Sequence, residues 1–400
     1  MMKIAILGYG TIGSGVYNVF TTNAEIVEKK AGEKIEVKYV LDLRDFPGDP
    51  AENVLVHDYK VIVNDPEVEC VVETMGGDKP AYTFVKECLL AGKSVTTSNK
   101  EMVANHGPEL VQIAKDKNTN FFFEASVGGA IPIIRPINES FSADEILEIR
   151  GIINGTTNYI LTKMDHEGTD YETALAEAQD KGYAERNPEA DVEGYDPARK
   201  IAILSSIACG RHVDYNDIYT EGITKLTAFD FEYARHMGKA IKLIASMRKE
   251  GKDVFASVCP MLIDTESPLF TVNDVFNGIL VNGKYSGTIM FYGRGAGSLP
   301  TASAVAADVV EIVRNRGNNE LIIWSDEKQP VTDRLEEKND FFVRVASFNK
   351  TKAREAFGEV EDIKPLNGEY AFIVRGITEA QYESAASRVR IINKLRLLNA

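Results

Sequence analysis

Residues 2–13 of the 400-residue chain read MKIAILGYGTIG, an apolar run that leads directly into three glycines. Residues 2–7 are expected to form a buried strand, and residues 14–30 have helical periodicity. A strand, a Gly-x-Gly-x-x-Gly turn and a helix in this order are typical of a dinucleotide-binding fold. An ordinary glycine-rich turn is the alternative, but this context favours the dinucleotide fingerprint.

Each residue of this turn has a physical reason to be there. Gly8 permits the tight turn, Gly10 lets the backbone approach a pyrophosphate, and Gly13 allows the helix to pack closely on the strand. The first helical residues, Thr11 and Ile12, would offer phosphates the free N–H groups and positive end of the helix dipole. We therefore take these five residues as candidate cofactor contacts.

Further strand–helix units follow this turn. Strands are expected at 35–41, 70–73, 94–97 and 121–124, with helices at 80–91 and 109–117. Ligands of doubly wound sheets bind beyond the carboxyl ends of the strands, so Thr74 and Ser98 are further cofactor candidates. Lys100 is either another such contact or a surface lysine that opens a helix. These patterns predict a Rossmann-type α/β domain of residues 1–140, completed by residues near 295–315.

The end of the second strand bears on which dinucleotide is bound. Asp42 could bond the ribose diol of NAD, whereas Arg44 could meet the 2′-phosphate of NADP. Asp42 lies further from Gly13 than the usual distance of about 20 residues. The sequence therefore leaves the choice between NAD and NADP open.

Two later turns could also approach ligands. Residues 124–132 read EASVGGAIP, and a turn of this kind exposes several carbonyl oxygens beside Glu124, which could hold a hard cation. A plain crossover turn is the alternative. Residues 293–297 read GRGAG, without the lysine of a nucleoside-triphosphate loop, and Gly295 could approach a ligand closely or simply turn the chain.

From about residue 141 the chain predicts a second, α+β domain that extends to residue 294, with strands at 146–153, 253–261, 279–281 and 287–292. Residues 183–200 read YAERNPEADVEGYDPARK, in which Asp196 would cap a buried helix and Pro197 would begin it. Lys200 lies one turn into that helix. It forms either a solvated pair with Asp196 or a functional one.

The composition bounds the classes of function. A net charge of -15 argues against a nucleic-acid partner, because phosphates would be repelled. No apolar run reaches the roughly 18 residues that cross a bilayer, and the chain begins with a strand instead of a signal peptide. The scattered cysteines suit reduced thiols: Cys70, Cys88, Cys209 and Cys259. We therefore expect a cytoplasmic protein of two or three domains.

Five separated motifs resemble those of homoserine dehydrogenase. They begin at residues 8, 97, 124, 151 and 194 and read GYGTIG, TSNK, EASVGGAIP, GIINGTTNYI and GYDPARK. Their order and spacing are the family's, and they cover roughly residues 2–315. The resemblance implies reversible conversion of L-homoserine and NAD(P)+ into L-aspartate 4-semialdehyde and NAD(P)H, a step toward threonine, methionine and isoleucine.

The resemblance also implies catalytic roles. Lys200 is similar to the family's acid/base residue, Asp196 to its partner, and Lys100 to the lysine between cofactor and substrate. Oxidation of a primary alcohol requires loss of the hydroxyl proton, which a lysine accepts only when it is neutral. Burial and the nearby positive charge of Lys100 would favour the neutral form of Lys200, whereas Asp196 would favour the charged form.

Binding roles are implied in the same way. Glu185 and Asp191, together with Asp196, resemble substrate-binding carboxylates that suit an ammonium group, and Thr156 resembles a backbone contact for the substrate. The helix start at 154–158 suits the substrate carboxylate, although capping explains its threonines equally well. The turn after residue 123 is similar to a site for a monovalent cation such as sodium, formed by Glu124, Val127, Gly129 and Ile131.

The tail departs from the family pattern. Residues 341–345, 353–357, 370–374 and 379–387 predict strand, helix, strand and helix, and residues 388–396 are expected to be helical. Long members of the family carry a regulatory ACT domain with an Asp-x-Pro-Gly-type turn after its first strand, where this chain has ASFNK. The resemblance therefore implies a shortened or degenerate ACT-like α+β domain at 320–400, and the missing turn argues against threonine feedback.

Two rival functions fit parts of this pattern. One is a dehydrogenase that acts on the amine of an amino acid. The other is a regulator that senses NAD(P)H or threonine without catalysis, against which the intact pair of Asp196 and Lys200 argues. As partners we expect the small-molecule substrate and a second copy of the chain, in a homodimer or higher homo-oligomer.

Overall fold

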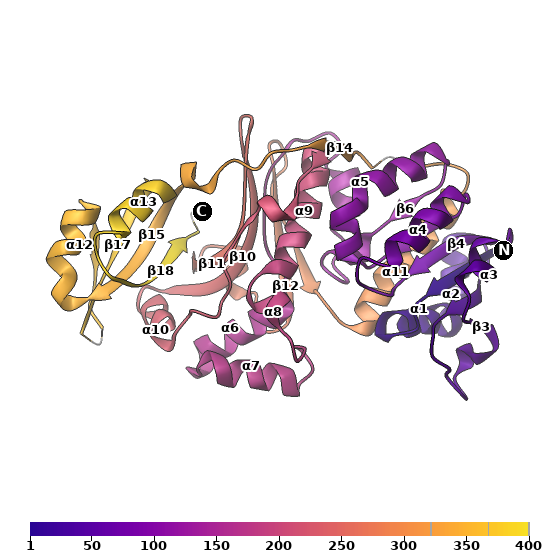
Figure 1. The fold of residues 1–400 in the computed structure, drawn as a ribbon, viewed down its shortest axis with the longest axis horizontal. Helices are drawn as coiled ribbons and strands as arrows, with labels where there is room; N and C mark the ends of the chain where they lie inside the picture. Colours follow the sequence, from indigo (N-terminus) through magenta and orange to yellow (C-terminus); the bar gives the residue numbers. More distant parts are fainter. Residues whose placement is uncertain (321, 367, 399–400) are drawn as a thin grey trace. The chain divides into compact units, whose positions relative to one another are not determined.

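The computed structural model describes residues 1–320, 322–366 and 368–398 and divides into two compact units (Figure 1). The first unit comprises residues 1–145, 202–215 and 291–329, and the second comprises residues 146–201, 216–290 and 330–400. Within the described residues, no helix combines the length and the hydropathy that a membrane crossing requires.

The first unit is built around a parallel sheet with the strand order β3-β2-β1-β4-β5-β6. Its strands are β1 (Met2–Leu7), β2 (Ile35–Leu41), β3 (Leu55–Val56), β4 (Val68–Glu73), β5 (Ser94–Thr97) and β6 (Phe121–Phe122). β1 pairs in parallel with β2 on one side and with β4 on the other. The winding direction reverses between β1 and β4, which creates the switch point where such sheets bind ligands. The predicted Rossmann-type sheet is confirmed.

Right-handed crossovers determine which helices cover which face. The chain passes from β1 to β2 through α1 (Thr11–Thr22) and α2 (Ala24–Ala31). On the other side of β1, α4 (Ala81–Leu90) connects β4 with β5, and α5 (Lys100–Asp116) connects β5 with β6. The two sets of helices therefore lie on opposite faces of the sheet (Figure 1). Far along the chain, α11 (Ser298–Arg314) returns to pack against α1 and buries Val305 and Val309 beside Ile4 and Ile6.

Two helices of this unit differ from the sequence-based prediction. The expected helix 14–30 is interrupted at Asn23, which ends α1 and begins α2. The helix expected at 109–117 begins already at Lys100, because the Asn99 side chain accepts a hydrogen bond from the Met102 N–H at 3.1 Å and caps it. Lys100 is therefore the first residue of a helix that follows directly on β5.

The second unit contains most of a mixed sheet with the strand order β13-β12-β7-β10-β11-β18-β15-β17-β16, and β9 pairs with β11 beside it. The central strands are β7 (Ile146–Ile152), β9 (Tyr219–Thr220), β10 (Lys239–Glu250), β11 (Asp253–Asp264), β12 (Phe276–Gly283) and β13 (Gly287–Arg294). The associated helices are α6 (Gly155–Glu167), α7 (Tyr171–Asp180), α8 (Glu189–Val192), α9 (Tyr195–Cys209) and α10 (Ala228–His236). This mixed sheet confirms the predicted α+β character of the second part of the chain.

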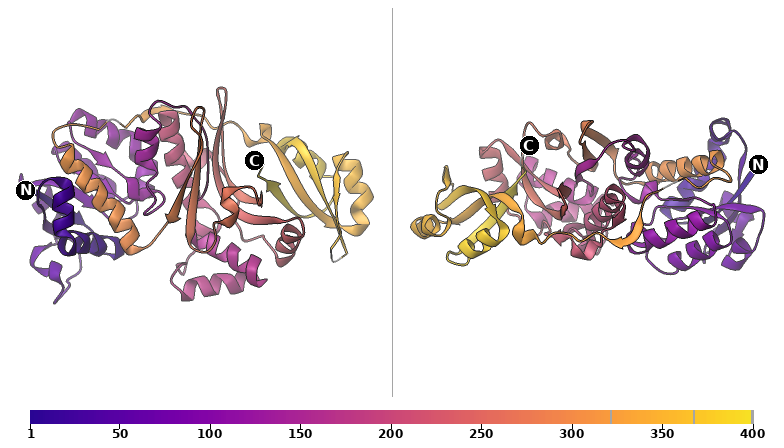
Figure 2. Two further views of the ribbon diagram at one scale, coloured as in Figure 1. Left: turned by 180° about the vertical axis from the view of Figure 1, so that it is seen from behind. Right: turned by 90° about the horizontal axis from the view of Figure 1, so that it is seen from above.

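The remaining strands and helices form what we call the C-terminal module, residues 338–398 except residue 367. Its order along the chain is β15 (Lys338–Ala346), α12 (Lys350–Phe357), β16 (Glu361–Ile363), β17 (Glu369–Thr378), α13 (Glu379–Ala386) and β18 (Ile391–Leu397). This βαββαβ arrangement buries a core that includes Phe341, Phe372 and Tyr382 (Figures 1 and 2). β18 pairs with β15 and also, in parallel, with β11, so the module continues the central sheet.

Two strands contradict the sequence-based expectations. Residues 388–396 were expected to be helical, but residues 391–397 form strand β18. Its Arg396 is buried and forms ion pairs with Glu221 and Glu379. A buried arginine masks the strand alternation, since the prediction assumes that charged residues face solvent. β10 was not predicted, and it pairs with β11 along its whole length, from Lys239↔Asp264 to Glu250↔Asp253.

Candidate active site

Of the three glycines after β1, Gly8 is required by its backbone conformation and Gly13 by close packing. Gly8 has φ +93°, a left-handed conformation that strains other residues. A Cβ atom on Gly13 would lie 1.9 Å from the Gly8 carbonyl oxygen, so only glycine lets α1 begin this close to the strand. At Gly10 an added Cβ would meet nothing within 4 Å. The backbone is therefore open at the residue predicted to approach a pyrophosphate, next to Thr11 and Ile12 at the start of α1.

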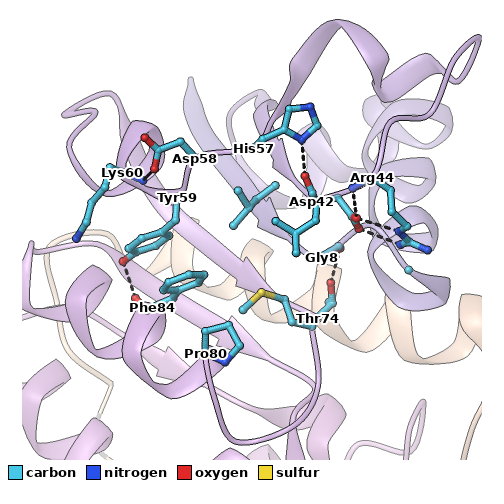
Figure 3. A pocket seen from close by; sticks show the side chains of 14 residues that line it. Gly8, Asp42, Arg44, His57, Asp58, Tyr59, Lys60, Thr74, Pro80 and Phe84 are labelled. Carbon is cyan, nitrogen blue, oxygen red and sulfur yellow. Dashed lines mark hydrogen bonds and ion pairs between the residues drawn. The ribbon is translucent and has the colours of Figure 1, made fainter.

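A cavity of about 750 Å³ opens beside this turn, beyond the ends of β2 and β4 (Figure 3). Of the predicted cofactor residues, Gly8, Gly10 and Thr74 line it. The Thr74 hydroxyl donates to the carbonyl oxygens of Leu7 and Gly8, at 3.1 and 2.9 Å, and so joins the ends of β1 and β4. The cavity's volume is in the range of small-molecule and cofactor sites.

Asp42 and Arg44 form a charged pair at the wall of this cavity (Figure 3). The Arg44 guanidinium donates to both carboxylate oxygens of Asp42, each at 2.9 Å, and the Tyr9 N–H donates to Oδ2 at 2.9 Å. Hydrogen bonding to Arg44 holds the pKa of Asp42 well below its usual range. Both residues that the sequence connects with the choice of dinucleotide therefore lie in one place, with their charges paired.

Sequence reasoning missed the part of the cavity wall that follows β3. His57, Tyr59 and Lys60 line the cavity here, from the segment that leads into α3 (Tyr59–Val63). The Tyr59 ring stacks on Phe84 at 3.9 Å between centroids, and its hydroxyl donates to the Phe84 carbonyl at 2.9 Å. The available signal was Asp58, which caps α3 by accepting a hydrogen bond from the Lys60 N–H at 2.8 Å.

Glu73, at the end of β4, is fully buried although the sequence gives it no role. Its carboxylate accepts hydrogen bonds from the Met75 and Gly76 N–H groups, at 2.7 and 3.3 Å, and from the Thr97 hydroxyl at the end of β5. Burial raises the pKa of Glu73, and the hydrogen-bond donors oppose that shift. The carboxylate therefore joins two strand ends and fixes the loop that begins at Thr74.

The same network reaches the predicted residues after β5. The Ser98 N–H donates to the Glu73 carbonyl at 3.4 Å. The Asn99 N–H donates to the Thr97 hydroxyl at 2.9 Å, and its side-chain amide donates to the Gly77 carbonyl at 2.6 Å. Lys100 follows directly, so its backbone is anchored to the loop that contains Thr74.

The turn after β6 uses its acidic side chain internally. The buried Glu124 carboxylate accepts hydrogen bonds from three consecutive N–H groups, of Ile133 at 2.6 Å and of Ile134 and Arg135 at 2.8 Å. The described residues contain no group of three or more histidine, cysteine or acidic side chains suited to a metal ion. A cation at this turn would therefore depend on backbone carbonyl groups.

The glycines of this turn meet the later glycine loop. Gly128 and Gly129 have φ values of +74° and +58°, which bend the chain sharply between Val127 and Ile131. A Cβ on Gly129 would lie 2.5 Å from the Gly295 carbonyl oxygen. Gly295, predicted as a cofactor contact, therefore lies directly against the turn predicted to hold a cation.

In the second unit, Asn154 joins two of the predicted substrate residues. Asn154 caps α6 by accepting a hydrogen bond from the Thr157 N–H at 2.9 Å, and its amide donates to Asp191 at 2.7 Å and to Asp196 at 2.8 Å. The sequence pattern of a cap residue gives no sign of this second role, since the amide reaches carboxylates 37 and 42 residues away. Asn154 therefore holds two carboxylates at the start of a helix.

Lys200 completes this cluster. Its Nζ lies 2.7 Å from Asp196 Oδ2 and donates to the Ile153 carbonyl oxygen at 2.9 Å. The side chains of Lys200 and Asp196 are 11% and 5% exposed, so the solvated surface pair is excluded. α9 begins at Tyr195, one residue before the cap that the sequence predicts, and Asp196 therefore lies in its first turn. The buried pair is the arrangement expected of functional residues.

The other two predicted substrate residues lie differently. Thr156 is in the first turn of α6, and its hydroxyl donates to the Tyr183 carbonyl oxygen at 2.5 Å. A substrate contact by Thr156 would therefore use its backbone N–H. Glu185 is exposed on the segment before α8, where its carbonyl oxygen accepts a hydrogen bond from Gln179 at 3.0 Å.

This cluster has the chemistry to bind an amino acid and move a proton. Carboxylates next to a buried amide can hold an ammonium group through charge-assisted hydrogen bonds, and the N–H groups that begin α6 favour a carboxylate. A lysine in hydrogen-bond contact with an aspartate can exchange a proton with a hydroxyl group.

Comparisons with known proteins identify the family. Residues 8–124 match the family model of the homoserine dehydrogenase NAD-binding domain, and residues 132–310 match the model of homoserine dehydrogenase. Homoserine dehydrogenase from Mycobacterium tuberculosis (strain ATCC 25618 / H37Rv) is 43% identical over 320 residues, which are 78% of this chain and 72% of the relative.

Solved structures agree with the sequence relatives. A homoserine dehydrogenase from Thiobacillus denitrificans has a TM-score of 0.90 at 31% identity, covering 100% of this chain and 98% of that one. A hyperthermophilic archaeal homoserine dehydrogenase in complex with NADPH has a TM-score of 0.64 at 26% identity and covers 78% of this chain and 98% of that one. The chain belongs to the homoserine dehydrogenase family.

Proposed function

We propose that the cluster of Asn154, Asp191, Asp196 and Lys200 binds L-homoserine and exchanges its hydroxyl proton. Family membership makes the chain an NAD(P)-dependent oxidoreductase that acts on a CH–OH group, which interconverts L-homoserine and L-aspartate 4-semialdehyde. The single observation that carries the assignment of roles is the buried contact of 2.7 Å between Lys200 Nζ and Asp196 Oδ2.

The substrate's charged ends meet groups of opposite charge. Asp191 and Asp196 accept hydrogen bonds from the substrate ammonium group, and exposed Glu185 adds negative charge on the same segment. The substrate carboxylate binds at the start of α6, where the Thr156 N–H is one of the free helical donors.

Lys200 moves the proton at its Nζ atom. In the direction of oxidation, neutral Lys200 accepts the hydroxyl proton of homoserine, and in the reverse direction its ammonium group returns it. Asp196 holds the lysine in place through its contact of 2.7 Å with Nζ. The aspartate thus positions the acid/base group and balances its charge.

The dinucleotide belongs to the glycine turn and the cavity beside it. The nicotinamide ring, when bound, supplies the hydride acceptor. The open backbone at Gly10 and the start of α1, at Thr11 and Ile12, suit the pyrophosphate, and Asp42 with Arg44 suits the adenosine ribose. Thr74, Ser98, Lys100 and Gly295 are further proposed contacts.

Arg44 makes NADP the better-supported choice. Its guanidinium pairs with Asp42, so the carboxylate repels a 2′-phosphate less than an unpaired aspartate would. In addition, an arginine guanidinium is itself a common ligand of phosphate groups. Asp42 still offers oxygen atoms to a ribose diol. We therefore propose that the chain uses both dinucleotides and favours NADP.

A monovalent cation such as sodium is proposed at the turn after β6. The Glu124 carboxylate is occupied by three N–H groups, so the ligands are backbone carbonyl oxygens of Glu124, Val127, Gly129 and Ile131. Activity at constant ionic strength, measured in sodium chloride and in tetramethylammonium chloride, tests this proposal. Equal activity in both salts contradicts it.

We also propose that the chain works as a cytoplasmic homodimer. β13 ends the order of the mixed sheet, and its Ile289 side chain is exposed, as sheet edges that pair with a second copy are. All four cysteines are free of disulfides, which suits a reducing compartment. Light scattering at micromolar concentration tests the dimer, and a monomeric mass contradicts it.

The assay for the function follows the absorbance of reduced nicotinamide with L-homoserine and either NAD or NADP. Turnover with homoserine and none with amino acids that lack the hydroxyl group is the expected result. Turnover that needs only an amino group would support the rival amine dehydrogenase. Dinucleotide binding without turnover would support the regulator.

A further inference from the structure

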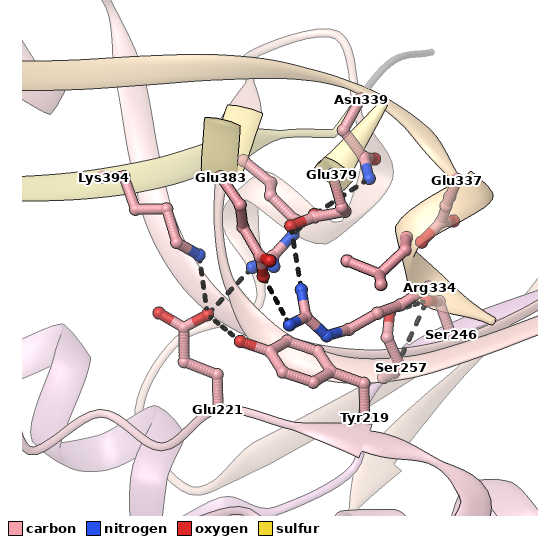
Figure 4. Close-up of polar contacts among 12 residues, drawn as sticks. Tyr219, Glu221, Ser246, Ser257, Arg334, Glu337, Asn339, Glu379, Glu383 and Lys394 are labelled. Atoms are coloured by element: carbon pink, nitrogen blue, oxygen red, sulfur yellow. Dashed lines mark hydrogen bonds and ion pairs between the residues drawn. The ribbon is translucent and has the colours of Figure 1, made fainter. Parts of the chain in front are cut away.

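Glu221 connects the central strands of the second unit with the C-terminal module (Figure 4). Its Oε2 accepts hydrogen bonds from Lys394 at 3.0 Å and from Arg396 at 2.9 Å, both on β18, and from the Tyr219 hydroxyl at 3.0 Å. Burial alone would raise the pKa of Glu221, but Lys394 and Arg396 outweigh it and lower the pKa to about 2. The carboxylate therefore stays charged and neutralises two cations of the last strand.

These cations belong to a buried charge network. Arg396 is 3% exposed and also pairs with Glu379, which is 1% exposed and pairs with Arg334. Removing one member of such a network leaves charge unpaired in a region with little water, which is strongly unfavourable. The side chain of Glu221 is therefore held firmly by the module.

The backbone beside Glu221 touches the segment that carries the substrate carboxylates. The Glu221 N–H donates to the Val258 carbonyl on β11 at 2.7 Å, and two residues later the Ile223 N–H donates to the Val192 carbonyl at 2.8 Å. Between them, a Cβ on Gly222 would lie 2.4 Å from the same Val192 oxygen. The two backbones are therefore in direct contact.

Side chains strengthen this contact. The Thr224 hydroxyl donates to Glu193 at 2.9 Å. Gly194 lies so close to β9 that an added Cβ would be 2.8 Å from the Thr220 side chain. Residues 220–224 thus contact residues 192–194, the piece of chain between Asp191 and Asp196.

We propose that Glu221 is a positioning residue through which β18 sets the geometry of residues 191–196 and thereby the affinity for the amino-acid substrate. The carboxylate fixes residues 219–224 against β18, and residues 222–224 fix the segment between the two substrate carboxylates. The inference rests on the proposed function only in that Asp191 and Asp196 bind the substrate.

The test compares KM values of four full-length single variants and one double variant. Glu221→Gln keeps the shape of the side chain but removes its charge, and Lys394→Met removes one partner from β18. The matched control, Glu361→Gln, removes an exposed carboxylate of the same module that pairs with Arg375. Asp191→Asn tests the substrate site itself.

For Glu221→Gln we expect the homoserine KM to rise about fivefold, with the dinucleotide KM much less affected. Lys394→Met should raise the homoserine KM in the same direction. The double variant should show less than the product of the two effects, since both act through one contact. The control should leave both KM values unchanged.

Several outcomes overturn the inference. An unchanged homoserine KM in Glu221→Gln, or equal increases in both KM values, would reduce Glu221 to a structural residue. Fully multiplicative effects of Glu221→Gln and Lys394→Met would show that β18 does not act through Glu221. If Asp191→Asn also leaves the homoserine KM unchanged, the assignment of the substrate site fails instead. If Asp191→Asn raises the homoserine KM and Glu221→Gln does not, the substrate site is supported and only the role of Glu221 is refuted.

Discussion

Lys200 Nζ lies 2.7 Å from Asp196 Oδ2, which also accepts a hydrogen bond from the Asn154 amide at 2.8 Å. One carboxylate oxygen therefore holds both the proposed acid/base group and the cap of α6. The lysine cannot move without disturbing the start of the helix that is proposed to bind the substrate carboxylate. Substrate binding and proton transfer are thus expected to depend on the same few contacts.

Lys200→Met should lower kcat by a factor of about 10² to 10⁴, the usual contribution of a general acid or base. The dinucleotide Kd should stay near that of the unchanged enzyme, because Lys200 lies outside the glycine turn and its cavity. Stopped-flow turnover and fluorescence titration with reduced dinucleotide measure the two quantities. Lys181→Met, which removes an exposed lysine paired with Glu177, is the control. Near-normal turnover of Lys200→Met would return the residue to a structural role.

Asn154→Asp should be more harmful than Asn154→Ala for substrate binding. The aspartate places a third carboxylate within hydrogen-bond distance of Asp191 and Asp196, and the amide that separates them is lost. We expect the homoserine KM to rise about tenfold in Asn154→Ala, which loses the hydrogen bonds to both carboxylates, and further in Asn154→Asp. Initial rates over a range of homoserine concentrations measure this. Equal KM values in the two variants would contradict the proposed crowding of negative charge.

Arg44→Ala should reverse the proposed preference for NADP. Loss of the guanidinium removes a phosphate ligand and leaves the Asp42 carboxylate to repel a 2′-phosphate. The ratio of kcat/KM for NADP to that for NAD should fall at least about tenfold, equivalent to about 1.4 kcal/mol. Parallel assays with both dinucleotides give the ratio, and an unchanged ratio excludes Arg44 as a specificity residue. His57→Ala, which lines the same cavity, controls for general loosening of its wall.

Glu73→Gln should weaken dinucleotide binding although Glu73 does not line the cavity. A glutamine offers one acceptor oxygen where the carboxylate offers two, so either the Thr97 hydroxyl or the N–H groups of Met75 and Gly76 lose their partner. The loop after β4 should then be less ordered, and the dinucleotide Kd should rise about tenfold. Calorimetric titration measures this Kd. An unaltered Kd with a lowered melting temperature would leave Glu73 a purely structural role.

The contribution of Glu221 to stability should depend on pH. Its pKa is lowered from 4.5 to about 2 in the folded chain, so the unfolded state takes up the proton first as the pH falls. The stabilisation, about 3 kcal/mol, is therefore fully present above about pH 4.5 and is lost as the pH falls toward 2. Calorimetry should show a difference in melting temperature between the unchanged chain and Glu221→Gln that is constant from pH 5 to 7 and shrinks at lower pH. If the difference in melting temperature does not shrink at low pH, the charge of Glu221 does not contribute to the stability of the chain.

Much of the first unit could be predicted because its signals are local. The strand, the three glycines and the helix after them lie within about twenty residues, and Gly8 and Gly13 are required by local backbone conformation and packing. The pair of Asp196 and Lys200 was also accessible, since residues four apart on a helix face each other. The cavity wall at His57 and Tyr59 was missed because its local signal, the helix cap Asp58, does not by itself indicate a ligand site.

The second unit was harder because distant contacts decide it. β10 reads KLIASM in its middle, a mixture of good helix formers, and is a strand because it pairs with β11 residue for residue. β18 was predicted helical because Lys394 and Arg396 look like a solvated basic face, whereas both bind Glu221, more than 170 residues away. The sequence indicates that a helix begins at Asn154, but it does not show that the Asn154 amide contacts Asp191 and Asp196.

The position of β18 between β11 and β15 also has a consequence for synthesis of the chain. Both neighbours leave the ribosome earlier, and until residues 391–397 follow, the facing edge of β15 and the part of the β11 edge beyond β9 have no partner strand. Open strand edges pair readily with other chains, so the nascent protein passes through a stage that is prone to aggregation. A chain that terminates before β18 would keep these strand edges open permanently, and its mixed sheet would stay prone to aggregation.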